Sequence, residues 1–345
     1  MTAKKLLLTG VIFVALVGVA VLAQKSETTA ERAANAANAF LASLQAEQKS
    51  RAVFSFDDKE RLRWWFTPQQ KAGKYTRKGL PLEDMTPEQQ KLARALLAAS
   101  TSEAGSKTAQ AIISLEDVLK DLEKGKGPVR NTGWYFVSIF GTPSKTGKWS
   151  WRLEGHHLSL HFTFAAGRIV SATPNVYASN PAEILEGKRK GERPLGDTID
   201  LYRELLQTLH KEQLVQAKQP KLFPEIRENE PKPSVGDPVG LPASALNEKQ
   251  KAALWNLIHA YAARLPRDFA DSEINRIREA GIEKVHFAFG GSDASERGKP
   301  YSYRIHGPTF LIEFLNEQPD AARNPANHIH SAWRTIGGDF GLIAK

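Results

Sequence analysis

The stretch KWSWRLEGHHLSLHFTF (residues 148–164) decides the fold, and PYSYRIHGPTFLIEFLN (300–316) repeats its pattern later in the chain. Aligned on their glycines, the two stretches also match aromatic residues and an arginine: Trp149 with Tyr301, Trp151 with Tyr303, and Arg152 with Arg304. Apolar and polar residues alternate around each glycine, which is typical of an antiparallel hairpin with a buried face. We therefore expect two related hairpins, and two ordinary hairpins of similar residues remain the alternative.

Helices are expected before each hairpin. Thr86-Pro87-Glu88-Gln89 and Asn247-Glu248-Lys249-Gln250 both place an N-cap residue three positions before a glutamine, which is the signature of a capping box. Apolar residues recur at helical spacing over 108–123, and a second helix of the later half is expected at about 270–280. Each hairpin therefore follows a pair of helices.

These elements divide the chain into five segments. Residues 1–23 form a targeting segment, 24–85 an N-terminal helix and loops, and 86–217 a first α/β half. A proline-rich connection over 218–246 leads to a second α/β half over 247–345. The expected class is α+β, with two related halves, each of helices plus an antiparallel β-hairpin, packed as one body.

The first 23 residues indicate export. MTAKK is followed by a run without charged residues from Leu6 to Ala23, apolar apart from Thr9, and small or modest residues precede Gln24. This arrangement predicts a cleaved signal peptide, or an uncleaved signal anchor because the run is just long enough to span a bilayer. Either reading places the body in the periplasm or outside the cell. Contact with a membrane is expected only through this segment, if it stays uncleaved.

The composition restricts the partners and the chemistry. The hydrophobic share of 41% and the charged share of 25% are those of a globular protein. Lysine and arginine exceed the acidic residues by nine but are scattered, and no nucleic-acid motif is present, so no nucleic-acid partner is expected. The chain has no cysteine, so any metal ion must be held by nitrogen and oxygen ligands.

Two histidine clusters are the strongest candidates for a site. In EGHHLSLHF (154–162), alternation along a strand places His157 and His161 on the polar face and His156 on the other, where we expect it to be packed and hydrogen-bonded. In NHIHSAW (327–333), His328 and His330 point to one side if the segment is extended. The four imidazoles His157, His161, His328 and His330 are therefore candidate metal ligands. A hydrogen-bonded structural cluster, or unrelated histidines, are the alternatives.

The aligned hairpins add carboxylates to this site. His161 aligns with Glu313, and Glu154 aligns with His306, so Glu154 and Glu313 are candidate catalytic bases. An ion pair with a neighbouring arginine is the structural alternative for Glu154. The candidate substrate-binding residues are Trp149, Trp151, Arg152, Arg304 and His306, although both tryptophans could instead cover the edge of the core.

Several motifs together resemble one family. WxWRxxGHHLSL (149–160), SIFG (138–141), NPA (180–182), LIEFxN (311–316) and NHIHSxWR (327–334) are similar to the bacterial family DUF3500. The resemblance implies an exported protein and brings no established activity. This chain has His161 where the family pattern implies asparagine, and Thr335 where it implies aspartate. The resemblance thus makes His161 a weaker ligand than His157 and leaves Asp339 as the carboxylate near the second cluster.

The sequence supports two functions of different kinds. The first is an exported protein that binds a divalent metal ion, with zinc first and copper, manganese or iron as alternatives, and that works as a metal-dependent hydrolase. The second is a non-catalytic envelope or carbohydrate-binding module with an aromatic-lined groove. The partner is then a small molecule or an envelope polymer, which the sequence does not identify.

Overall fold

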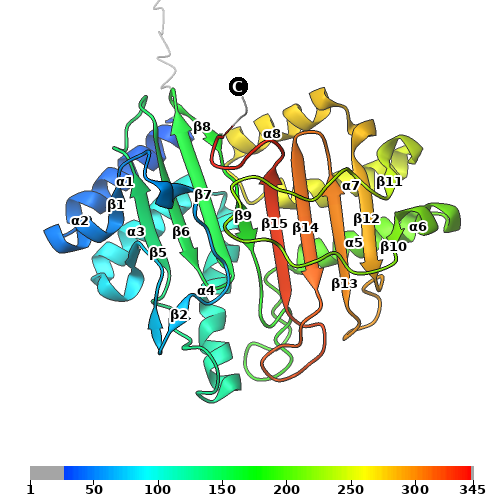
Figure 1. The fold of residues 1–345 in the computed structure, drawn as a ribbon, viewed down its shortest axis with the longest axis horizontal. Helices are drawn as coiled ribbons and strands as arrows, with labels where there is room; N and C mark the ends of the chain where they lie inside the picture. Colours follow the sequence, from blue (N-terminus) through cyan, green and yellow to red (C-terminus); the bar gives the residue numbers. More distant parts are fainter. Residues whose placement is uncertain (1–26, 343–345) are drawn as a thin grey trace, which may run out of the picture.

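One large mixed β-sheet forms the centre of the molecule. The computed structural model describes residues 27–342 (Figure 1). Its strands follow the order β1-β5-β6-β7-β9-β15-β14-β13-β12-β10 across the sheet, with β4, β8 and β11 paired beside this path. The bounds are β1 Val53–Phe54, β4 Leu80–Pro81, β5 Phe136–Phe140, β6 Trp149–Gly155, β7 Leu158–Ala165, β8 Arg168–Ser171, β9 Asn175–Tyr177, β10 Lys218–Gln219, β11 Leu241–Pro242, β12 His286–Gly291, β13 Tyr301–His306, β14 Phe310–Asn316 and β15 Ile329–Thr335.

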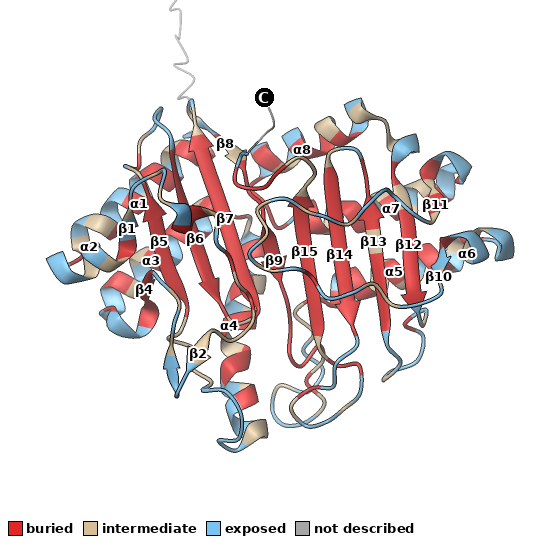
Figure 2. Cartoon of the chain, in the orientation of Figure 1, coloured by how far each residue is buried: buried red, intermediate tan, exposed pale blue. Residues whose placement is uncertain are grey.

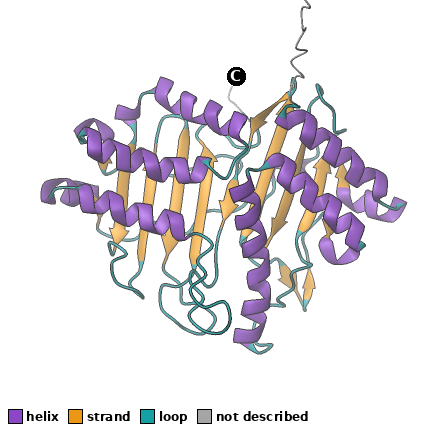
Figure 3. Ribbon diagram, turned by 180° about the vertical axis from the view of Figure 1, so that it is seen from behind, coloured by secondary structure: helices purple, strands orange, loops and turns teal. Residues whose placement is uncertain are grey.

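The described helices cover one face of this sheet, as the view from behind shows (Figure 3). They are α1 Thr29–Ser43, α2 Ala46–Ala52, α3 Pro87–Ser100, α4 Glu103–Glu123, α5 Gly196–Thr208, α6 Lys211–Ala217, α7 Glu248–Ala262 and α8 Arg267–Ala280. Short 3-10 turns and the small ribbon β2 Gln70–Lys71 with β3 Lys74–Tyr75 complete the elements. Both predicted capping boxes are confirmed, one at the start of α3 and one at the start of α7. No helix in the described part is long and apolar enough to cross a membrane.

The two hairpins carry the apolar core between sheet and helices. In β6–β7, Trp151 lies opposite Phe162 and their rings stack at 5.3 Å, while Trp149 stacks on Phe164 at 4.4 Å. In β13–β14, Tyr303 stacks on Phe314 at 4.6 Å. Aromatic cross-strand pairs stabilise a hairpin beyond the burial of their area. The core strands are buried along most of their length (Figure 2).

The two hairpins belong to one continuous sheet. β9 pairs with β7 on one side and with β15 on the other, so these strands join the N-terminal and C-terminal parts of the sheet. The α+β class is therefore confirmed. Helices α5 and α6 cover the region 197–217 that was assigned to the first half, and they pack against α7, β11 and β12. Residues 1–26 lie outside the described part, and the predicted targeting segment is among them.

Two long connecting segments with little regular structure run across the sheet face opposite the helices. Residues 55–80 lie over β5–β7, and residues 220–240 run over the strands from β15 to β12 (Figure 1). We call these the first and second straps. The straps meet where the backbone amides of Phe66 and Thr67 donate to Glu228, and where Asn229 donates to the Trp64 carbonyl at 3.0 Å. A small apolar cluster fills the space beneath them, formed by Trp64, Phe66, Val176, Ile226, Ala332 and Phe340.

Candidate metal centre

His157 lies in the tight turn between β6 and β7. Its φ of +65° is left-handed, a conformation in which histidine is found more often than most residues with a Cβ. Its backbone amide donates to the Phe66 carbonyl of the first strap at 2.7 Å, and its carbonyl accepts from Ala178. The expectation that His156 and His157 alternate along a strand is therefore wrong, because the two residues form the turn and a turn does not keep the period of two.

His328 and His330 stand at the start of β15. The backbone amide of His328 donates to the Asn316 side chain at 3.0 Å, and Ile329 exchanges backbone hydrogen bonds with Ser179. Strand geometry points His328 and His330 to the same side, as predicted. The intervening Ile329 is fully buried in the main core. The two imidazoles consequently face the strap side of the sheet.

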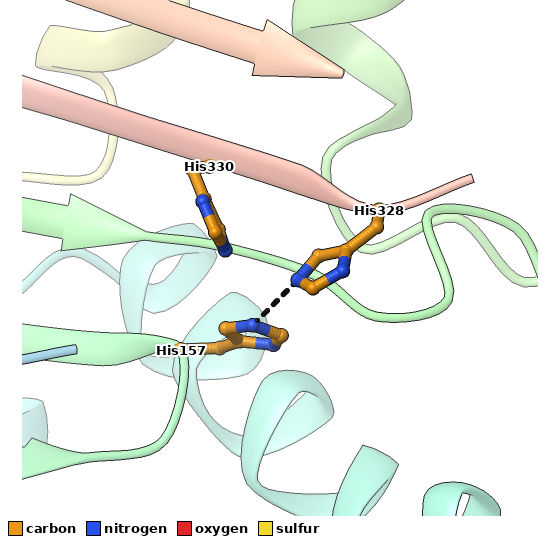
Figure 4. Close-up of side chains that lie close together, drawn as sticks. All are labelled: His157, His328 and His330. Atoms are coloured by element: carbon orange, nitrogen blue, oxygen red, sulfur yellow. Dashed lines mark hydrogen bonds between the residues drawn. The ribbon is translucent and has the colours of Figure 1, made fainter. Parts of the chain in front are cut away.

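The turn and the strand bring three imidazoles together (Figure 4). One ring nitrogen from each of His157, His328 and His330 lies within 4.8 Å of the others. Nε2 of His157 and Nε2 of His328 are 2.9 Å apart. Nδ1 of His330 lies 2.7 Å from a carboxylate oxygen of Glu225, which leaves Nε2 of His330 to face the other two rings. The sequence prediction that His157 lies close to the H-x-H pair is confirmed.

Burial disfavours the protonated form of two of these imidazoles, His157 and His328. Desolvation, followed by the neighbouring histidines, holds the pKa of His157 well below its usual 6.5. The same causes lower the pKa of His328 to about 2. Since only a neutral imidazole has a lone pair for a metal ion, this environment disfavours the protonated form that would compete with binding.

The spacing fits a first-row metal ion. Two imidazole nitrogens at about 2.1 Å from a zinc ion are roughly 3.4 Å apart in a tetrahedral site. The closest pair here is shorter than that and the widest is longer, so shifts of about an ångström bring all three into range. Three protein ligands leave at least one position open, which is the arrangement of catalytic zinc sites. The cluster could therefore hold a metal ion together with a water molecule or substrate.

The other two histidines of the first cluster lie outside this group. His156 is hydrogen-bonded to Glu116 at 2.5 Å and contacts Arg130 at 3.1 Å, in line with the expected packed role. His161 contacts Ser159 at 3.0 Å and the edge of the Phe340 ring. The structure does not bring His161 to the other ligands, because it projects from the middle of β7 whereas His157 lies at the strand's beginning.

The two candidate bases are each paired with an arginine, and neither belongs to the group of three clustered histidines. Glu154 pairs with Arg77 of the first strap at 3.2 Å and accepts from the Trp65 amide at 2.9 Å. Glu313 pairs with Arg304 on the neighbouring strand at 2.9 Å, and burial raises the pKa of this carboxyl. Glu313 lines a cavity of about 150 Å³ that Glu225 also lines. Glu313 therefore lies near the residue that holds His330, whereas Glu154 belongs to a buried ion pair.

The candidate substrate-binding residues do not form an aromatic groove. Trp149 and Trp151 are 0% and 1% exposed, because the hairpin turns this face towards the helices, where Trp151 donates to Ser100. This corrects the expectation that they contact a ligand. Arg152 is equally buried and binds Glu60 of the first strap. Arg304 lines the 150 Å³ cavity, and His306 is buried at the far end of β13, opposite His286.

Sequence reasoning missed two residues that contact the cluster. Glu225 lies in the proline-rich connection, and nothing in its local sequence distinguishes it from the other acidic residues there. Asn180 contacts Nδ1 of His328 through its amide nitrogen at 3.3 Å. Asn180 begins the NPA motif, which was noticed only as part of the family resemblance. Asp339, considered as a partner for a histidine, instead binds Arg334 at 2.6 Å.

The fold and the site together define an α+β protein with a three-histidine cluster that could hold a metal ion. The chain belongs to the family of proteins of unknown function DUF3500, whose model matches residues 26–342. The resemblance drawn from the sequence motifs is therefore confirmed. No curated protein and no solved structure matches the chain.

Proposed function

We propose that this protein binds one divalent metal ion, zinc first, through the Nε2 atoms of His157, His328 and His330. The observation that carries this proposal is the convergence of three imidazole nitrogens within 4.8 Å on the sheet face opposite the helices. Glu225 supports it, because a carboxylate on the second nitrogen of a metal-binding histidine fixes the ring and makes it a better ligand. Manganese, iron and copper are the alternatives for an all-nitrogen site.

We propose further that the bound metal ion activates a water molecule for hydrolysis. Three protein ligands are the number found in catalytic zinc sites, whereas structural sites use four. Solvent reaches the outer side of His330 through Glu225, whose side chain is 42% exposed while that of His330 is 6% exposed. A metal-bound water loses its proton near neutral pH, which supplies the nucleophile. Burial of Trp149 and Trp151 removes the support for the alternative, a carbohydrate-binding module.

An internal repeat would explain why the site lies in the middle of the sheet. The pair α1–α2 precedes β1, which is parallel to β5, and the pair α5–α6 precedes β10, which is parallel to β12. The side chains of Gln48 and Gln89 bond to each other as those of Gln213 and Gln250 do. We infer two related halves that meet at β9 and β15. An experimental structure in which the two runs fail to superpose would contradict this.

Export is proposed from the N-terminal sequence alone. The charged start and the apolar run of residues 6–23 are those of a signal peptide or a signal anchor. N-terminal sequencing of the protein from fractionated cells tests this proposal. A chain that begins at Gln24 in the periplasm or medium is expected after cleavage, and a chain that retains Met1 in the membrane indicates an anchor. An intact chain in the cytosol would refute export.

Metal content tests the central proposal. The protein is stripped with a chelator, loaded with zinc and dialysed, and its metal content is measured by elemental analysis. We expect about one zinc ion per chain in the wild type and a residual amount in the double variant His328→Ala, His330→Ala. The matched control is His161→Asn, which removes a buried histidine of the same hairpin outside the cluster. A wild-type protein that takes up no zinc, manganese, iron or copper rules out the proposed function.

A further inference from the structure

A groove of about 920 Å³ lies at one outer edge of the sheet, between α5, α6 and β12 (Figure 1). Its apolar lining comes from all three elements: Leu206 of α5, Leu214 and Val215 of α6, and Phe289 of β12. None of the three clustered histidines lines it. A hollow of this size, lined mainly by apolar side chains with a few charged groups, has the usual properties of a small-molecule site.

One face of α6 forms a wall of this groove. Lys211, Leu214, Val215 and Lys218 follow one another at intervals of three, one and three positions, so their side chains lie along one side of the helix. Val215 is 71% exposed, more than any other large apolar residue among residues 27–342. A single exposed valine is common on protein surfaces, but Val215 extends the apolar lining of the groove outwards. The helix therefore presents two aliphatic side chains to the groove between two lysines.

The opposite edge of the sheet has the same construction but different residues. There α2 leads into β1, which is parallel to β5, as α6 leads into β10, which is parallel to β12. Counted back from the strand, Lys49 and Ser50 take the places of Leu214 and Val215. In each of these helices only the last alanine is buried, so their packing does not require an exposed valine. Val215 is thus better explained by a ligand in the groove than by the fold.

The unpaired charges around the groove are positive. Lys211 and Lys218 are exposed and form no ion pair among residues 27–342. The acidic residues of the groove are already engaged, because Glu296 pairs with Lys299 at 3.8 Å and Asp293 accepts hydrogen bonds from its own loop. A ligand with an acidic group is therefore attracted to the rim of the groove, and a ligand with a cationic group is not.

We propose that this groove binds one anionic amphiphile, a molecule with a long apolar part and an acidic head. The apolar part lies against Leu206, Val215 and Phe289, and the head lies at Lys211 or Lys218. A long-chain carboxylate is the simplest ligand of this class. A membrane surface is not the expected partner, because the apolar side chains line a hollow and not a protruding face. The inference concerns a second site and does not rest on the metal centre.

Calorimetric titration of the metal-free protein with dodecanoate, below the concentration at which it forms micelles, tests this proposal. We expect one dodecanoate per chain and weaker binding of dodecyltrimethylammonium, which has the same chain and a cationic head. The double variant Leu214→Lys, Val215→Ser gives α6 the residues of α2 and should weaken dodecanoate binding by about 10-fold or more. Val215→Ser alone keeps the core contact of Leu214 and should weaken it by about 3-fold. The double variant Lys211→Gln, Lys218→Gln should weaken it by about 2- to 10-fold.

Val239→Ser and Lys49→Gln are the matched controls, because Val239 and Lys49 are an exposed valine and an exposed lysine outside the groove. Both should bind dodecanoate as the wild type does, and thermal melting shows whether each variant remains folded. A wild type that binds no dodecanoate, or that binds both amphiphiles equally, overturns the proposal. Wild-type affinity in folded Val215→Ser and in the lysine variant, or an equal loss in the controls, also overturns it. Binding to vesicles of anionic phospholipid without binding of dodecanoate overturns it as well, in favour of a membrane surface.

Discussion

Replacement of Glu225 by alanine is predicted to weaken zinc binding without unfolding the protein. Its carboxylate lies 2.7 Å from Nδ1 of His330 across 105 residues of sequence, and this hydrogen bond fixes both the rotation of the ring and the position of its proton. Loss of such a partner typically costs 10- to 100-fold in metal affinity, or about 1.4 to 2.7 kcal/mol. Glu225→Gln keeps an acceptor but loses the negative charge, so its effect is expected to lie between that of alanine and that of the wild type.

Zinc affinity of these variants is measured by competition with a chromophoric chelator at constant pH. Glu230→Ala is the control, because Glu230 lies in the same strap and, among residues 27–342, its side chain forms only a surface pair with Arg227 at 3.5 Å. Circular dichroism melting of the metal-free proteins shows whether the strap remains folded. Wild-type affinity in Glu225→Ala, or an equal loss in Glu230→Ala, would refute the role assigned to this carboxylate.

Three further predictions follow from burial and charge. Zinc at 100 times its dissociation constant is expected to stabilise the folded protein by about 2.7 kcal/mol. For roughly 300 residues this raises the melting temperature by about 4 °C. A calorimetric melting temperature that zinc does not change would contradict binding to the folded state. Because the pKa of His157 is lower in the folded protein than its usual 6.5, the unfolded chain takes up the proton first. The contribution of His157 to the free energy of unfolding of the metal-free protein is therefore constant above about pH 6.5. Below that pH it falls by up to about 1.4 kcal/mol per pH unit. Urea titrations that show no such fall would contradict the burial of His157. Trp151→Ala is expected to cost about 3 to 5 kcal/mol of unfolding free energy, whereas a small loss accompanied by lost polysaccharide binding would favour an exposed tryptophan.

The sequence predicted the parts of the fold that depend on local pattern. The alternation of apolar and polar residues predicted the hairpin of β6 and β7, and the capping boxes predicted where α3 and α7 begin. The same alternation failed at His156 and His157, because a two-residue turn interrupts the strand there. A period of two describes only residues that stay extended.

The sequence predicted that His157, His328 and His330 lie close together, and it did not predict the residues that support them. The H-x-H spacing identified His328 and His330. His157 was identified from the histidine-rich stretch EGHHLSLHF (154–162). Glu225 could not be found, because its contact with His330 depends on how an irregular strap crosses the sheet. The burial of Trp149 depends on which face of the hairpin meets the helices, and the alternation alone leaves that choice open.

X-ray absorption at the zinc edge of the loaded wild-type protein tests the central claim most directly. The account predicts one zinc ion with three imidazole nitrogens at about 2.0 to 2.1 Å and one further oxygen neighbour. The imidazole signal should fall from three to two in His330→Ala. Zinc surrounded only by oxygen atoms, or a signal unchanged in that variant, would show that the three histidines are not the metal ligands.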